Sequence, residues 1–462
     1  MTIKPSLSPA ATMGYSGHVR ALLVLGVPLI GGHLGQIAIG VTDTVMMGWY
    51  GVNELAAITL AATFFHVFFL LGAGFAWAVM PLVAAYAAEG DEVGIRRATR
   101  MGLWLSAAFA VLVLPVLLFS EPILRLLGQS EAAASGAAEY LRIAGWGIIP
   151  ALGVMVLKSY LAGLERTQAV FWIIIAAAVA NGVFNYAFIF GNWGAPELGL
   201  AGAAWASNFT QTLSLIGVVV YARAALPEHN LFQRLWKIDG PMMARVFSLG
   251  WPIGLTALSE VSLFSASALM MGWLGTLPLA AHGIVVQLAS VTFMVHMGLS
   301  NAATVRAGNA HGRRDRAHLA RGAKTAFALS LGFAALTIAA FLLFPDPLLS
   351  LALDAEDPAK PEILAIGAML LAVAALFQLV DGAQVIALGV LRGVQDTRVP
   401  MIMAAVSYWL IGIPCSYVLG FTFGLEGVGI WLGLVLGLSA AAVLLMARFW
   451  GPAIRTVGVA TE

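Results

Sequence analysis

Charged residues are scarce in this sequence of 462 residues and make up only 10% of it. Typical globular domains contain roughly 25% charged residues. The formal net charge is only +1, which gives no sign of a polyanionic partner such as nucleic acid. The single cysteine, Cys415, cannot form a disulfide within the chain. This composition excludes a water-soluble enzyme, a nucleic-acid-binding protein and a disordered scaffold.

Apolar residues are abundant instead. They make up 60% of the chain, which also contains 50 glycines and has a mean hydropathy of +0.91. A transmembrane helix needs about 20 mostly apolar residues. Twelve runs of this kind lie at 21–47, 55–84, 101–119, 138–162, 168–190, 199–222, 246–273, 279–303, 322–344, 364–388, 400–421 and 426–449. The sequence therefore predicts an all-α polytopic membrane protein with twelve transmembrane helices.

The basic residues predict how these helices are oriented. Short loops rich in Lys and Arg stay on the cytoplasmic side of a membrane. With the N-terminus placed inside, all but four of the 24 Lys and Arg residues fall on that side. The exceptions are Arg125, Arg142 and Lys360 outside, and Lys158 within the fourth run. We therefore predict that both termini are cytoplasmic and that the membrane is a bacterial-type inner membrane.

The two halves of the sequence resemble each other. Segment 26–57 aligns without gaps with segment 250–281. The repeat predicts two pseudo-symmetric six-helix bundles, with one lobe at 1–222, a cytoplasmic linker at 223–245 and a second lobe at 246–462. Both halves enter the membrane from the same side, because each has an even number of helices. Membrane proteins built from parallel repeats are typically secondary transporters that bind substrate between the halves.

Three acidic residues lie inside the apolar runs: Asp43, Glu260 and Asp381. A charged group at bilayer depth costs roughly 2.5–3.5 kcal/mol on insertion scales. Such a group is retained where it faces a cavity and binds a proton, an ion or a cationic substrate. The alternative is a buried acid bonded to backbone or hydroxyl groups. Glu260 and Asp381 both fall near the middle of the membrane, so we predict that they share one site for H⁺ or Na⁺.

Polar residues predict a second site around Asp43. Asn181 and Asn185 are four residues apart and therefore share one face of the fifth helix. Ser207 enters the sixth helix at a similar depth. A carboxylate, two amides and a hydroxyl form an oxygen-rich cluster suited to a hard cation such as Na⁺ or to a protonation switch. Neutral polar packing is the alternative for the amides and the hydroxyl.

The repeat also exposes an asymmetry between the halves. Glu260 aligns with Gln36, whereas Asp43 aligns with Ser267. The two acids therefore lie on equivalent helices about 10 Å apart along the helix axis. Gln36 shares a helix face with Asp43, so it either lines the same substrate cavity or is a neutral polar residue in the packing.

Two prolines occupy matching positions in the repeat, Pro28 and Pro252. Each removes a backbone hydrogen bond from a transmembrane helix. Both hinges and static kinks are consistent with this pattern.

Several motifs of energy-converting and hydrolytic proteins are missing from the sequence. There is no Walker A motif for ATP, no HExxH zinc motif and no GxSxG nucleophile elbow. The predicted loops are short, so no soluble domain carries chemistry. We predict that the protein is not an enzyme, needs no cofactor other than a coupling ion, and draws its energy from an ion gradient.

At this point the chain resembles the multidrug and toxic compound extrusion (MATE) family. The resemblance covers all twelve predicted helices. The motifs that carry it are Val41-Thr42-Asp43-Thr44 with Met47-Gly48, the Gly-x-Pro openings of the first and seventh helices, Glu260, and Leu391-Arg392-Gly393 with Gln395-Asp396-Thr397. The pairing of Glu260 with Asp381 resembles the NorM-like branch more than the DinF-like branch.

The resemblance implies a V-shaped arrangement of two lobes and efflux of organic, mostly cationic, drugs against inward flow of Na⁺ or H⁺. It implies that Glu260 and Asp381 form the coupling site of the second lobe. It implies the same role for Asp43 with Asn181, Asn185 and Ser207 in the first lobe, although the family often has Thr at the position of Ser207. We expect a monomer whose partners are drugs and membrane lipids. The alternatives are a lipid-linked precursor flippase, an intramembrane enzyme and a channel.

Overall fold

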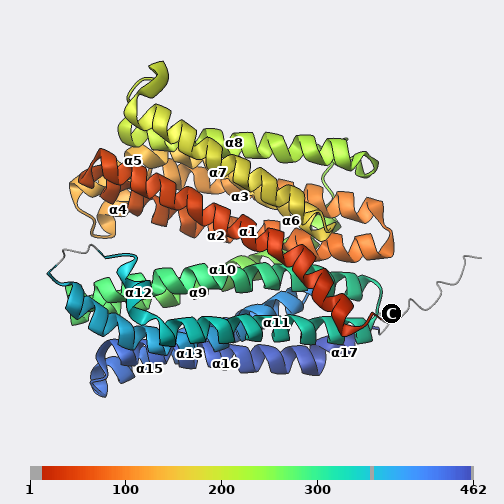
Figure 1. The fold of residues 1–462 in the computed structure, drawn as a ribbon. Helices are drawn as coiled ribbons and strands as arrows, with labels where there is room; N and C mark the ends of the chain where they lie inside the picture. Colours follow the sequence, from red (N-terminus) through yellow and green to blue (C-terminus); the bar gives the residue numbers. More distant parts are fainter. Residues whose placement is uncertain (1–12, 354–357, 459–462) are drawn as a thin grey trace, which may run out of the picture.

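The computed structural model describes residues 13–353 and 358–458 of the chain. Every secondary-structure element in these ranges is helical, and twelve helical stretches are long and apolar enough to cross a membrane. Each of the twelve predicted runs overlaps one of these stretches, so the predicted all-α membrane fold is confirmed. The long helices lie side by side and run from one end of the molecule to the other (Figure 1).

The first half of the chain forms the upper part of the view in Figure 1. Its helices are α1 (Tyr15–Tyr50), α2 (Val52–Glu89), α3 (Glu92–Leu118), α4 (Ser120–Leu126), α5 (Glu131–Ala144), α6 (Ile148–Gly163), α7 (Thr167–Phe190) and α8 (Gly199–Ala225), with the 3-10 turns η1 (Gly145–Gly147), η2 (Asn192–Gly194) and η3 (Pro227–His229). The fourth transmembrane stretch combines α5, η1 and α6.

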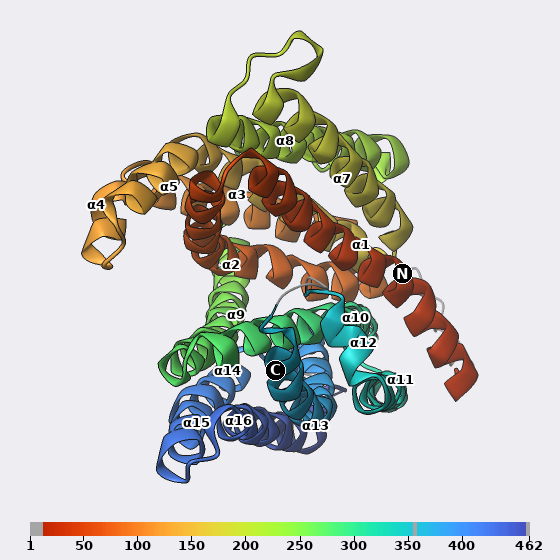
Figure 2. The same ribbon diagram turned by 60° about the vertical axis from the view of Figure 1, so that its left-hand side comes forward.

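The second half forms the lower part of the same view, and the turned view separates the two groups of helices (Figure 2). Its helices are α9 (Gly240–Leu274), α10 (Thr276–Gly312), α11 (Arg316–Leu343), α12 (Pro345–Ser350), α13 (Lys360–Gly393), α14 (Arg398–Ala405), α15 (Ile413–Tyr417), α16 (Glu426–Arg448) and α17 (Ile454–Thr456), with the π-helical segments η4 (Val406–Gly412), η5 (Val418–Thr422) and η6 (Phe449–Ala453). The eleventh transmembrane stretch runs from α14 to η5.

Aspartates start three of the long helices at the end of the bundle that carries most of the basic residues, which we call the basic face. The carboxylates of Asp91, Asp239 and Asp315 each accept a hydrogen bond from the backbone N–H three residues later, at the starts of α3, α9 and α11. A side chain that accepts from the first helical turn satisfies one of its unpaired N–H groups. These caps fix where the chain re-enters the bundle.

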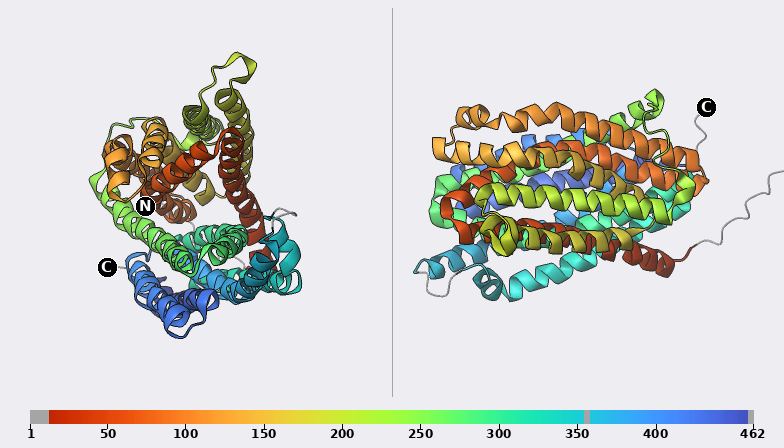
Figure 3. Two further views of the ribbon diagram at one scale, coloured as in Figure 1. Left: turned by 90° about the vertical axis from the view of Figure 1, so that its left-hand side faces the viewer. Right: turned by 90° about the horizontal axis from the view of Figure 1, so that it is seen from above.

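The two halves touch each other on the basic-face side of the bundle. In the described residues, the hydrogen bonds, ion pairs and ring contacts between α1–α8 and α9–α17 include Tyr86 with Arg245, Glu165 with Asn309, and Phe75 with Phe247. The one that lies furthest along α1 joins His33 to Asn301, at 3.0 Å. Further from the basic face than His33 and Asn301, no hydrogen bond, ion pair or ring contact joins the two halves in the described part of the chain. Seen end-on, α1 crosses from one group of helices to the other (Figure 3), and its His18 contacts His318.

Glycines let the halves approach closely on this side. A Cβ atom placed on Gly74 of α2 would lie 2.4 Å from the carbonyl oxygen of Gly250 and 2.8 Å from Cα of Gly254 on α9. Backbone atoms cannot move aside as a flexible side chain can. Small residues at such a crossing are the usual means by which membrane helices pack tightly.

We expect the substitution Gly74→Ala to lower stability by about 1–3 kcal/mol, because the added methyl group forces α2 and α9 apart. Gly217→Ala in α8 is the matched control, since a Cβ there meets no atom within 4 Å. The control should be neutral or slightly stabilising, because Ala is the better helix former. Thermal unfolding in detergent measures both. A Gly74→Ala protein as stable as the control would contradict this packing.

Candidate functional site

Asp43 of α1 lies in a cluster of polar side chains from α7 and α8. Asn185 Nδ2 donates a hydrogen bond to Asp43 Oδ1 at 2.5 Å, and Ser207 Oγ lies 3.5 Å from Asp43 Oδ2. Asn181 accepts from Asn185 Nδ2 at 3.2 Å, as expected for residues four apart on a helix. The structure thus brings together all four residues that the sequence grouped around Asp43.

Two polar atoms of this cluster are buried and have no hydrogen-bond partner among the described residues. They are Oδ1 of Asn185 and Nδ2 of Asn181, and both side chains are fully buried. Leaving such a group unpaired costs about 1–3 kcal/mol. Asp43 and Ser207 are half-buried, so the cluster is open to its surroundings on one side. A free amide oxygen beside a carboxylate is an arrangement that a cation or a water molecule can complete.

Gln36 stands apart from this cluster. Its side chain is exposed, and the structure describes no hydrogen bond from it to Asp43. Ser267, the counterpart of Asp43 in the repeat, is fully buried, and its hydroxyl donates to the backbone oxygen of Phe264 at 2.7 Å. A satisfied hydroxyl therefore occupies the second-half position that is equivalent to Asp43.

In the second half, Glu260 of α9 and Asp381 of α13 are linked by one amide group. Gln384 Nε2 donates to Glu260 Oε1 at 2.7 Å and lies 3.5 Å from Asp381 Oδ1. The sequence prediction that these two acids share a site agrees with this geometry. Two carboxylates in one low-dielectric site repel each other unless a proton or a cation lies between them.

Tyr408 determines which way the bridging amide points. Its hydroxyl donates to Gln384 Oε1, and both side chains are fully buried. Because the amide oxygen accepts from Tyr408, the amide nitrogen must face the two acids. Tyr408 lies in the π-helical segment η4, just before Pro414. Pro414 cannot donate a backbone hydrogen bond, and such irregular turns are frequent at functional sites.

The second-half cluster also contains polar atoms without partners. They are Oδ2 of Asp381 and both polar atoms of Gln378, and these side chains are at most 1% exposed. Gln378, Asp381 and Gln384 all lie on α13, at helical spacings of three that place them near one another. Glu260 is half-buried, so it is the member of the cluster that faces open space.

Sequence reasoning missed four members of the two clusters. Gln378 and Gln384 were identifiable, because each lies three residues from Asp381 on the same helix. Tyr408 comes from another helix, and Tyr140 of α5 lies near Asp43 and Ser207. Their positions depend on how the helices pack, and spacing along the chain gives no sign of them.

The two prolines lie inside long helices, Pro28 in α1 and Pro252 in α9. The static structure describes one position of each helix, so a hinge at either proline stays a prediction. Pro252 is buried in the contact between the halves, next to Gly250 and Gly254.

The fold and the two clusters define a membrane transporter built from two repeated bundles, each with a carboxylate site. The family model described as MatE matches residues 28–187 and 252–418. The two matches begin at Pro28 and Pro252, the positions that the internal repeat aligns. The chain belongs to the MATE family, which confirms the resemblance seen in its motifs.

Relatives across most of the chain place it in the NorM-like branch. It is 46% identical over 435 residues to a protein from Rhizobium meliloti (strain 1021) named "Probable multidrug resistance protein NorM", with 94% of this chain and 93% of that protein covered. A protein of the same name from Agrobacterium fabrum is 41% identical over 443 residues, covering 96% and 95%. The predicted branch is thus confirmed.

Solved structures of the family share the fold. A eukaryotic MATE transporter, AtDTX14, superposes with a TM-score of 0.83 at 19% identity, covering 96% of this chain and 99% of that one. A MATE in the bent conformation gives a TM-score of 0.86 at 18% identity, covering 97% and 100%. At such identities the likeness concerns the fold, and it confirms the predicted two-bundle architecture.

We expect Tyr408→Phe to destabilise the protein by about 1–3 kcal/mol, because the buried Gln384 Oε1 loses its donor. Tyr417→Phe is the control. Tyr417 lies in the same transmembrane stretch, is 51% exposed, and makes no side-chain hydrogen bond in the part of the chain that the structure describes. Thermal unfolding compares the two variants, and equal stability would contradict the bridging role of Gln384.

Proposed function

We propose that this NorM-like transporter is a secondary antiporter that exports organic, mostly cationic, compounds in exchange for Na⁺ or H⁺. The observation that carries the proposal is the bridge from Gln384 to both Glu260 and Asp381 inside the bundle. Two acids held this close bind one positive charge readily and are costly without it. The names of the relatives, which refer to multidrug resistance, support the choice of substrate class.

The free oxygens support a site for a positive charge in each half. Among the described residues, the free oxygen in the first half is Asn185 Oδ1, beside the Asp43 carboxylate, and in the second half it is Asp381 Oδ2, in the same cluster as Glu260. Oxygen ligands of this kind suit Na⁺, and a carboxylate oxygen accepts H⁺ equally well. When bound, either ion supplies a positive charge that neutralises the acids.

The contacts between the halves support an outward-facing form. They lie on the basic-face side, up to the level of His33 and Asn301. In the proposed topology this side is cytoplasmic, both termini lie inside, and the membrane is a bacterial-type inner membrane. The lobes at 1–222 and 246–462 rock about this closed side, with residues 223–245 as the linker. Pro28 and Pro252 are the proposed hinges.

Competition couples the two fluxes in this mechanism. Binding of H⁺ or Na⁺ from outside neutralises the acids and removes the attraction that holds a cationic drug. The drug then leaves to the outside. Linkage requires that the drug weakens binding of the ion by the same factor. Gln36 and the half-buried faces of Asp43 and Glu260 are the proposed contacts with the drug cavity.

A flippase for lipid-linked precursors is less well supported. Such a protein needs a basic cavity between its membrane-spanning helices that accommodates a pyrophosphate, whereas the acids inside the apolar runs here are Asp43, Glu260 and Asp381. The membrane-embedded Lys158 lines a cavity of only about 30 Å³ together with His33 and Asn301. That volume is close to that of a single water molecule in the liquid.

We expect Asp43→Asn, Glu260→Gln and Asp381→Asn to reduce drug efflux to the level of cells without the protein, because each removes a negative charge that binds the ion. Asp346→Asn is the matched control, since Asp346 is an exposed acid in α12. Ethidium accumulation in cells measures efflux, and the amount of inserted protein is measured in the same cells. Wild-type efflux by all three variants would remove the site assignment.

The coupling ion is identified in proteoliposomes that hold the purified protein. We expect ethidium transport under an imposed Na⁺ gradient, a pH gradient, or both, and no transport without a gradient. Asp346→Asn should respond as the wild type does, and Glu260→Gln should respond to neither gradient. Transport that requires ATP, or that ignores both gradients, would overturn the antiport mechanism.

A further inference from the structure

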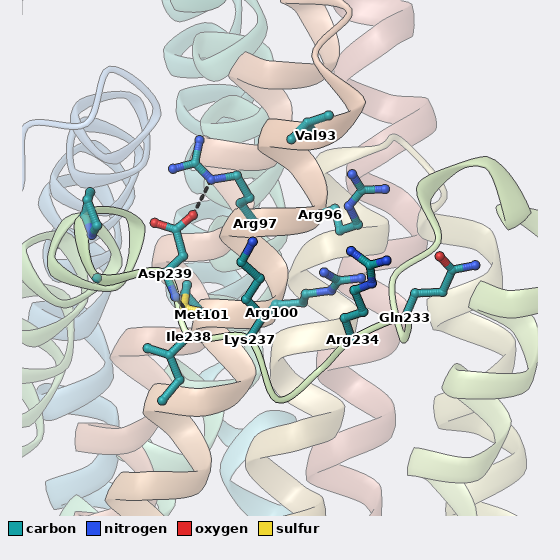
Figure 4. A pocket seen from close by; sticks show the side chains of 12 residues that line it. Val93, Arg96, Arg97, Arg100, Met101, Gln233, Arg234, Lys237, Ile238 and Asp239 are labelled. Carbon is teal, nitrogen blue, oxygen red and sulfur yellow. Dashed lines mark hydrogen bonds and ion pairs between the residues drawn. The ribbon is translucent and has the colours of Figure 1, made fainter.

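A strongly basic cavity lies on the basic face, away from both carboxylate clusters. It has a volume of about 580 Å³ and lies between the start of α3 and the segment that leads into α9. Five cationic side chains line it: Arg96, Arg97, Arg100, Arg234 and Lys237. Figure 4 shows these side chains around a common space, with three on α3 and two on the linker.

Among the described residues, a single acid lines the cavity, and it is already paired. Asp239 accepts a hydrogen bond from Arg97 and also caps α9 through the Met242 N–H. The Arg97 guanidinium lowers the pKa of Asp239, so this carboxylate stays ionised at neutral pH. It neutralises one of the five cations. Glu92 and Glu228 lie nearby but do not line the cavity.

Arg100 is held in place without an acidic partner in the part of the chain that the structure describes. Its Nε donates to the backbone oxygen of Leu231 at 2.7 Å, and its Nη2 donates to that of Asn230 at 2.8 Å. The linker carbonyls thus orient the guanidinium but leave its charge uncompensated. A planar guanidinium fixed in this way is suited to a phosphate group.

The cavity lies beside the start of the third apolar run, at the end of the bundle that carries the basic face. The apolar run of the third helix begins at residue 101, just after Arg100. Trp104 donates from its indole nitrogen to the backbone oxygen of Leu235 at 2.6 Å, so the linker reaches this level. On either side of Lys237, Trp236 is 77% exposed and Ile238 is 57% exposed. Tryptophan is enriched at membrane interfaces.

We propose that this cavity binds the phosphate of an anionic phospholipid headgroup from the adjacent leaflet. Its cations match the phosphate, and the exposed Trp236 and Ile238 match the start of the acyl chains. The volume lies within the roughly 300–1,000 Å³ of ordinary ligand sites. The bound lipid would hold the linker against α3 and thereby join the two halves of the transporter on this side.

Thermal unfolding of the full-length protein in neutral detergent tests this assignment. The probes are short-chain phosphatidylglycerol, short-chain phosphatidylcholine and inorganic phosphate, each titrated separately. We expect phosphatidylglycerol to raise the melting temperature with a saturable dependence. We expect phosphatidylcholine and inorganic phosphate to have little effect at the same concentrations.

Two double variants, each of which removes two positive charges, show whether the lipid binds in this cavity. In Arg234→Gln/Lys237→Gln both substituted side chains are exposed, and neither makes a side-chain hydrogen bond in the described part of the chain. The half-maximal lipid concentration should rise about ten- to thirty-fold, as expected for the loss of two cations near anionic lipid. The control Arg313→Gln/Arg316→Gln, also exposed on the basic face, should change it less than about two-fold.

Three results would overturn the proposal. Equal stabilisation by phosphatidylcholine would show that the headgroup charge is not recognised. Equal stabilisation by inorganic phosphate would point to a soluble phosphate compound in place of a lipid. Equal shifts in the two double variants would show a diffuse attraction of the whole basic face, without a site in this cavity.

Discussion

The structure depends on carboxylates that are kept inside an apolar bundle. Each of the three is stabilised by side-chain amides: Asn185 donates to Asp43, and Gln384 donates to Glu260 and approaches Asp381. An amide can donate to an anion, but it carries no charge that neutralises it. The amides therefore orient the acids without neutralising them, and among the described residues the cation that attracts one of them is Arg392, which acts on Glu260. A carboxylate held in this state favours binding of a proton or a cation. The free energy that its burial costs is offset by the packing of the rest of the bundle.

The repeat builds this condition twice, in two different ways. In the first half the acid lies on α1 near its far end, and the amides lie on α7. In the second half the acids lie on α9 and α13, and a tyrosine on a π-helical segment orients the amide between them. Ser267 and Gln36 occupy the exchanged positions, and neither carries a charge. The two halves thus share equivalent helices but place different chemistry on them, so they need not bind the same ion in the same step.

Much of this could be predicted from the sequence, and the limits have physical causes. Hydropathy and the repeat predicted the twelve helices. An acidic residue within an apolar run is recognisable from the sequence alone, which is why Asp43, Glu260 and Asp381 were identified. Tyr408 and Tyr140 are ordinary aromatic residues in the sequence, and only helix packing brings them to the acids. The position of Gln36 beside the same cavity as Asp43 was inferred from helical spacing. Spacing shows which face of the helix a side chain occupies, but it does not show which residues that side chain contacts. Likewise, a net charge of +1 concealed a local cluster of five cations.

The basic cavity lies on the basic face, whereas the acidic clusters lie further inside the bundle. The halves are joined by close glycine contacts and by polar bonds on the basic-face side, where the linker is also fastened to α3 through Arg97, Arg100 and Trp104. In the proposed mechanism, opening of the bundle on that side breaks the contacts between the halves, such as those of Tyr86 with Arg245 and His33 with Asn301. Neutralising Glu260 or Asp43 would change the electrostatic interactions at the acid clusters, which lie away from this closed side. Rigid helices can transmit such a change along their length. In the proposed mechanism the acids thus set the balance between conformations, and the contacts on the basic face set the energy barrier between them.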